Sequence, residues 1–95
     1  MQFLVIARDG TDAEALNRRM AARPAHFENA RRMKACGQLI TGGAMLDAEG
    51  RMIGSMLLAE FPDQAALEAA IAADPYVEGQ VWQDIEIKPF RVAPL

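Results

Sequence analysis

His26 is the only histidine of the chain, and its chemistry gives the first indication of a function. An imidazole exchanges a proton near neutral pH, so it suits the role of acid or base in an active site. Asp74 stands where a later helix is expected to stop, directly before Pro75. A carboxylate bonded to one ring nitrogen would fix the tautomer and leave the other nitrogen free. The residue types therefore predict an acid–base pair of His26 and Asp74, or else a buried histidine bonded to a structural acid.

Three further residues are candidates for holding a substrate. Arg23 carries a planar guanidinium that suits a carboxylate, although it could equally form an ion pair with a nearby acid. Ser55 could orient a ligand with its hydroxyl or bond only to its strand neighbours. Tyr76 could close a pocket with its ring and offer its hydroxyl, or simply pack where the preceding helix ends.

Sites of other kinds are not expected. One histidine and one cysteine cannot build a zinc site within a single chain, so we predict no metal and no cofactor. Gly42-Gly43 is too sparse for a phosphate-binding loop. Cys36 is expected to be a small buried residue rather than a nucleophile, and Trp82 to lie in the core or at an interface.

Charge and composition exclude several partners. The net charge is −3 without a basic stripe, which argues against nucleic-acid binding. The arginines at 18, 19, 31 and 32 are expected to form a solvated helix face. No stretch is long and apolar enough to span a bilayer, and the first residues lack the features of a signal peptide. We therefore expect a cytoplasmic, reducing setting without membrane contact.

The 95 residues predict a single domain over 1–95 with strands and helices in a regular order. A capping box over 11–14 should begin a helix, Pro24 should break it near 21–23, and a second helix should run from Pro24 to a cap at Gly37. Asp63 should cap the next helix, over 64–73. The expected strands are 2–8, 38–45, 52–61 and 81–92.

Helical periodicity puts both members of the acid–base pair on core-facing stripes. His26, Ala30 and Met33 follow at i, i+4 and i+7, while Asp74 lies three residues after Ile71. His26 would stand in the first turn of its helix, where free amides favour the neutral ring. Asp74 would lie at the negative end of its helix.

Strand, helix, strand, strand, helix, strand is the order of the split βαβ pattern, in the α+β class. It predicts a ferredoxin-like, four-stranded antiparallel sheet with its helices on one face. The other face would expose Leu4, Ile6, Met56 and Leu58, or else their neighbours of opposite parity. An apolar surface of this kind favours a homodimer that pairs two sheet faces into a barrel, and the sequence leaves open whether dimers assemble further.

Five short segments, in this order, resemble a known family over nearly the whole chain: 23–26, 41–43, 54–55, 74–77 and 88–90. Together they resemble the YCII-related family of small bacterial proteins, part of the dimeric α+β barrel superfamily. The chain differs at Ala44, where many relatives carry proline. The resemblance implies a ferredoxin-like protomer, a dimer built through the sheets, and a His–Asp dyad carried by His26 and Asp74.

The resemblance also implies a range of functions. One branch of the family is associated with removing chloride from a chlorinated hydroxyquinol, and most members have no assigned reaction. We expect a small cofactor-free enzyme, lyase-like or dehydrochlorinase-like, that acts on a small aromatic or enolisable molecule through His26 and Asp74. The alternatives are a non-catalytic dimeric module for metabolite binding or a stress response, and a purely structural domain.

Overall fold

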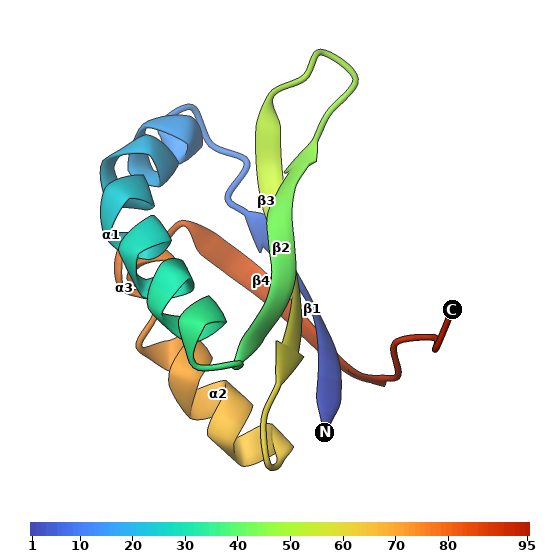
Figure 1. Ribbon diagram of the computed structural model, residues 1–95. Coiled ribbons are helices and arrows are strands. Elements are labelled where there is room, and N and C mark those ends of the chain that lie inside the picture. The colour runs from blue at the N-terminus through green and yellow to red at the C-terminus, as the bar shows by residue number, and fades with distance from the viewer.

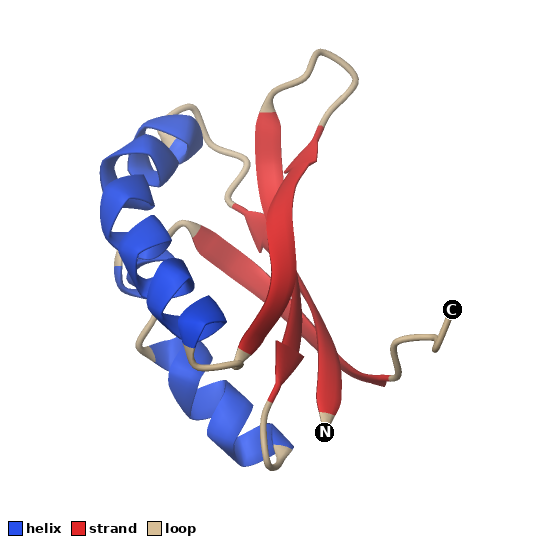
Figure 2. Cartoon of the chain, viewed as in Figure 1, coloured by secondary structure: helices blue, strands red, loops and turns tan.

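The computed structural model describes residues 1–95, and its elements follow the predicted order except for an additional short helix over 75–78. They are β1 (Gln2–Asp9), α1 (Ala15–Ala35), β2 (Leu39–Leu46), β3 (Met52–Glu60), α2 (Gln64–Ala72), α3 (Pro75–Glu78) and β4 (Trp82–Phe90). All three helices lie on the same side of one sheet (Figures 1 and 2). The ferredoxin-like α+β architecture predicted from the sequence is confirmed.

The sheet has the strand order β2-β3-β1-β4 with antiparallel neighbours. β1 is therefore central, and its alternating side chains define the two faces of the sheet. Phe3, Val5 and Ala7 point toward the helices and are fully buried. They form the centre of the hydrophobic core, with Leu67 of α2 among the residues packed there.

The face without helices is apolar along β1 and β3 and charged along β4. Its half-buried apolar residues are Leu4, Ile6, Met56 and Leu58, paired directly across the two strands. On the β4 side, Arg8 lies 3.0 Å from Asp84 and 2.9 Å from Glu86. The predicted apolar surface is present, with a band of ion pairs beside it.

α1 runs without a break through Pro24, so the predicted interruption near 21–23 is wrong. The predicted capping box is wrong as well, because the helix begins at Ala15 and Thr11 caps nothing. Asp12, rather than Thr11, makes the polar contacts before the helix. Its carboxylate accepts a hydrogen bond from the Glu14 amide at 3.2 Å and lies 2.6 Å from the Arg18 guanidinium. At 21 residues α1 is the longest helix, yet no helix combines the length and apolar character needed to cross a membrane.

The later helices begin at aspartates. Asp63 caps α2 as predicted, accepting from the Ala66 amide at 2.8 Å. Asp74 follows the C-cap of α2, at the negative end of that helix as expected, and its extended backbone also makes it the N-cap of α3. Its Oδ1 accepts from the Tyr76 amide at 2.9 Å, and Pro75 occupies the first turn, where its missing amide hydrogen costs nothing. The carboxylate therefore lies where backbone amides are free to donate.

Trp82 lies in the core, one of the two positions expected for it. Simple alternation would put its side chain on the open face with Asp84, but a register shift between Arg8 and Asp9 turns it to the helix side. Such a bulge places an extra residue in one strand and changes the face of those beyond it. Cys36 is exposed at the end of α1 rather than buried.

Replacing Pro24 by alanine tests how α1 accommodates the proline. An interior proline costs a helix ~3 kcal/mol, while the restricted unfolded chain returns up to ~1 kcal/mol. Because Pro24 is exposed and alanine restores a backbone donor, we expect Pro24→Ala to raise the free energy of unfolding by about 1–2 kcal/mol. Urea denaturation measures this, and an unchanged or lower midpoint would show that α1 needs the proline.

Candidate active site

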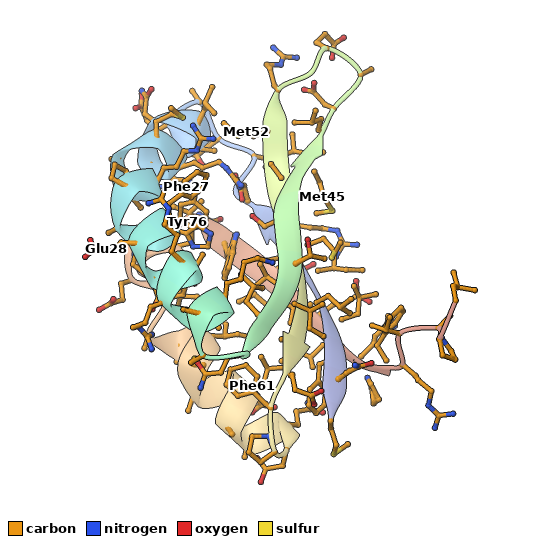
Figure 3. The ribbon with its side chains drawn as sticks, in the orientation of Figure 1. Phe27, Glu28, Met45, Met52, Phe61 and Tyr76 are labelled. Atoms are coloured by element: carbon orange, nitrogen blue, oxygen red, sulfur yellow. The ribbon has the colours of Figure 1, made fainter.

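A cavity of about 310 Å³ lies between α1 and the β2–β3 hairpin. Figure 3 shows two of its lining residues, Phe27 and Met52, on these two opposed elements. Glu28, by contrast, projects from α1 away from the sheet (Figure 3). The remaining lining residues are Arg19, Arg23, His26, Ala30, Leu39, Gly42, Gly43, Ala44, Ser55 and Leu57.

The structure brings together His26, which lines this cavity, and Asp74, which does not. His26 Nδ1 lies 2.8 Å from Asp74 Oδ1, and both side chains are buried. An ionised carboxylate only accepts hydrogen bonds, so Nδ1 carries the proton and Nε2 keeps its lone pair in the neutral ring. Nε2 has no protein partner and is not among the buried unpaired atoms, so it is open to the cavity that His26 lines.

Two aromatic side chains, Tyr76 and Trp82, pack against the imidazole ring of His26. The Tyr76 ring stacks on His26 with centroids 3.7 Å apart and planes 9° apart. Trp82 meets His26 edge-on at 5.5 Å. Tyr76 is fully buried and does not line the cavity, its hydroxyl has no hydrogen-bond partner, and burial raises the pKa of its phenol. Its position supports the histidine ring rather than contacting a ligand.

A buried polar network that the sequence interpretation missed lies beside this pair. Arg19 was assigned to a solvated face, yet it is 3 % exposed. Its Nη1 lies 3.0 Å from both carboxylate oxygens of Asp9, and its Nη2 donates to Ser55 Oγ at 2.9 Å. Trp82 Nε1 donates to the same oxygen at 3.1 Å. Arg19 Nε is a buried donor without a partner.

The sequence contains a signal for this network. Arg19 precedes His26 by seven residues, which puts both on one face of an uninterrupted helix. The predicted break at 21–23 would place Arg19 and His26 on two different helices, so the predicted helices did not indicate that they share a face. Asp9 likewise continues the alternation of Val5 and Ala7 onto the helix side of the sheet, although the strand was expected to end one residue earlier.

Arg23 and Ser55 both line the cavity, as their candidate roles require. Arg23 forms no ion pair, and its guanidinium lies over the Phe27 ring at 4.6 Å. Ser55 bonds to Arg19 and Trp82 rather than to its strand neighbours. No carboxylate lines the cavity, so its charged lining is cationic.

The strand side of the cavity is kept open by small residues. A Cβ on Gly42 would lie 2.9 Å from the Met56 carbonyl oxygen, so only glycine fits the observed backbone. Gly43 and Ala44 continue this rim, and Ala44 is the position where the resemblance to relatives fails. No three His, Cys, Asp or Glu side chains are grouped so that they could hold a metal ion.

Comparison with protein families decides the relationship suggested by the sequence segments. The model of the YCII-related domain matches residues 1–91. The chain belongs to the YCII-related family. Protein YciI of Escherichia coli O6:H1 is 32% identical over 97 residues, covering 96% of this chain and 97% of that protein. An uncharacterised Haemophilus influenzae protein is also 32% identical over 97 residues, with the same coverage.

Solved structures share the fold at lower identity. A 5-chloro-2-hydroxyhydroquinone dehydrochlorinase from Burkholderia phenoliruptrix AC1100, in complex with 2,5-dihydroxybenzoquinone, has a TM-score of 0.85 at 21% identity, covering 98% of this chain and 96% of its own. A dimeric ferredoxin-like protein of unknown function from Jannaschia sp. CCS1 has a TM-score of 0.58 at 15% identity, covering 96% and 98%. These similarities establish the fold.

Removing Asp9 tests how the buried network is held. Asp9→Ala leaves the Arg19 charge buried without its counter-ion, which we expect to lower the free energy of unfolding by about 3–5 kcal/mol. Asp84→Ala is the matched control, because Asp84 pairs with Arg8 at the exposed surface and should change stability little. Urea denaturation of both variants measures the difference. If Asp9→Ala destabilised the protein no more than Asp84→Ala does, water would be hydrating the Arg19 guanidinium in place of the lost carboxylate.

Proposed function

We propose that this protein is a small, cofactor-independent enzyme that transfers a proton of a small aromatic or enolisable substrate. The observation that supports this most is the orientation of His26: Asp74 holds Nδ1 at 2.8 Å while Nε2 is open to the cavity. A ring nitrogen with this arrangement is suited to general base catalysis. The ~310 Å³ volume is at the small end of ligand pockets and fits a single substituted ring.

His26 Nε2 takes the acidic proton of the substrate, and Asp74 stabilises the imidazolium that forms. Arg23 and Ser55 hold the substrate, with the unpaired guanidinium of Arg23 opposite the negative charge that develops on its oxygen. Tyr76 keeps the imidazole plane fixed during the transfer. Each group therefore has one task. His26, Arg23, Ser55 and Tyr76 come from helices or strands, which position side chains more accurately than loops do, and Asp74 is fixed as the N-cap of α3.

The substrate class is proposed by analogy with the dehydrochlorinase of the same fold. Overall, such a reaction removes one proton and one chloride. Two O–H bonds break and their electron pairs become part of two carbonyls. One of the two protons forms a C–H bond at the ring carbon that carries chlorine, and chloride leaves with the electron pair of its bond to that carbon. The cationic lining of this cavity suits the phenolate that precedes loss of chloride.

Substitution of the pair tests the proposed role. With 5-chloro-2-hydroxyhydroquinone under anaerobic conditions, we expect His26→Gln to lower the rate of chloride release by about 10²–10⁴-fold, the usual contribution of a positioned acid or base. Asp74→Asn should lower it at least ~10-fold, because the amide no longer fixes one tautomer. Ion chromatography follows the chloride.

Glu28→Gln is the control, since this side chain lies on the outer face of the same helix. It should keep the full rate. A folded His26→Gln protein with unchanged turnover would remove the proposed catalytic role. Reversible binding of the compound by the wild-type protein without turnover would favour the metabolite-binding module instead.

We also propose that the open sheet face pairs two copies of the chain. Support comes from the half-buried apolar residues Leu4, Ile6, Met56 and Leu58 on that face, and from the dimeric ferredoxin-like protein of the same fold. Burying this surface against a second copy removes apolar area from water.

The proposal includes a cytoplasmic setting, because the exposed, unpaired Cys36 suits a reducing compartment.

A charge at the centre of this face tests the dimer. We expect Leu58→Lys to halve the mass measured by light scattering, because an unpaired ammonium would be buried in the interface. Leu16→Lys is the matched control, since Leu16 is exposed on α1, away from the open face. A Leu58→Lys protein that stays dimeric would show that the interface lies elsewhere.

A further inference from the structure

The hydroxyl of Ser55 has both of its acceptor positions occupied. Arg19 Nη2 lies 2.9 Å and Trp82 Nε1 lies 3.1 Å from Oγ. A guanidinium and an indole nitrogen donate hydrogen bonds and never accept them. A hydroxyl oxygen has two lone pairs and one proton, so this oxygen accepts twice and its proton must be donated elsewhere. No protein atom accepts it, while Ser55 is 2 % exposed and lines the cavity.

Neither donor is free to turn away. The carboxylate of Asp9 holds Arg19 through both of its oxygens, and the guanidinium lies 4.9 Å from the Tyr76 ring centroid. Trp82 meets the Tyr76 ring edge-on at 5.4 Å and is 4 % exposed. The orientation of the Ser55 hydroxyl is therefore imposed by its surroundings. A hydroxyl that accepts from a charged donor is also polarised, which strengthens its own donation.

We propose that Ser55 is a fixed hydrogen-bond donor that selects ligands presenting an acceptor oxygen, such as a carboxylate, phenolate or enolate. Arg19 and Trp82 act as positioning residues, and Asp9 acts through Arg19. The inference rests on the proposed function in that it places the ligand in the same cavity. It adds that the site discriminates by the direction of one hydrogen bond. A ligand of the same shape that can only donate a hydrogen bond toward Ser55 is rejected.

The rest of the lining agrees with this selection. Arg23 brings a positive charge without an ion pair, and no carboxylate faces the cavity. His26 Nε2 is an acceptor in the neutral ring. The cavity thus combines one acceptor for an acidic proton with a donor and a cation for an oxyanion. A ligand with a hydroxyl close to a second oxygen matches all three groups.

Benzoate and benzamidine are suitable probes, because they have nearly the same shape but the first only accepts and the second only donates. We expect the wild-type protein to bind benzoate at least ~10-fold more tightly by calorimetry. Ser55→Ala should lower benzoate affinity by about 10–100-fold, as for hydrogen bonds to charged groups, and leave benzamidine unchanged. Trp82→Phe keeps Ser55 but frees one lone pair of its Oγ to accept a hydrogen bond from a ligand. It should therefore raise the affinity for benzamidine and reduce the preference for benzoate over benzamidine.

A readout that needs no ligand accompanies the binding data. Trp82 is the only tryptophan, so its indole N–H gives a single signal in proton–nitrogen NMR spectra. Ser55→Ala removes the acceptor of this N–H, and we expect an upfield shift and faster hydrogen exchange while the remaining signals stay dispersed. Arg23→Gln is the control: it should weaken benzoate binding and leave the indole signal in place.

The outcomes separate the two proposals. Benzoate binding that Ser55→Ala leaves intact and Arg23→Gln removes would overturn the fixed donor but keep an anion-binding cavity. An indole signal unmoved by Ser55→Ala would also overturn it. Failure of the wild-type protein to bind benzoate would overturn the fixed donor, whereas the enzyme proposal is decided separately by chloride release. Ser55-dependent selectivity in a protein without turnover would support the fixed donor and count against the enzyme.

Discussion

One uninterrupted helix face determines where the polar groups of this protein can meet. Arg19, Arg23 and His26 follow one another at i, i+4 and i+7, and they share a face only because α1 passes Pro24 without a break. At 1.5 Å per residue this places them within roughly 10 Å along the helix axis. The strands beneath supply their partners, among them Asp9 for the first arginine. A helix interrupted at 21–23 would have directed Arg19 elsewhere, and the cavity would have lost its buried cation.

The fold could be predicted from local rules, and much of the site could not. Strand alternation, helical periodicity and the cap at Asp63 depend on neighbouring residues, so the sequence specifies them directly. The prediction that His26 and Asp74 lie on core-facing stripes follows from the same rules, and the two side chains do meet. Arg19 was misplaced because a charged side chain is by default assigned to solvent, and because an interior proline usually ends a helix. The burial of Trp82 depends on a bulge whose register is set by the partner strand, which no local pattern reveals.

Stability does not explain the buried ion pair of Asp9 and Arg19. Removing two charges from water costs several kcal/mol each, and apolar residues of the same volume often do as well or better. The pair also leaves Arg19 Nε buried without a hydrogen-bond partner, which costs further stability. This cost weighs more in a domain that buries only 19 of its 95 residues. What the pair does accomplish is geometric: it holds a guanidinium against the hydroxyl of Ser55 at the cavity wall. The oriented donor that we propose at Ser55 accounts for an arrangement that folding alone would not favour.

The proposed acid–base pair of His26 and Asp74 and the buried network are joined by their shared aromatic residues. Tyr76 stacks on the imidazole of His26 and also carries the guanidinium of Arg19 against its ring. Trp82 touches His26 with its edge while its nitrogen fixes Ser55. Because the same rings position both groups, the acceptor nitrogen and the donor hydroxyl cannot move independently of each other. Electrostatic stabilisation is most effective when donors and acceptors are oriented before the ligand arrives. In this domain the groups of the candidate site are built into the core, where close packing keeps each one in place.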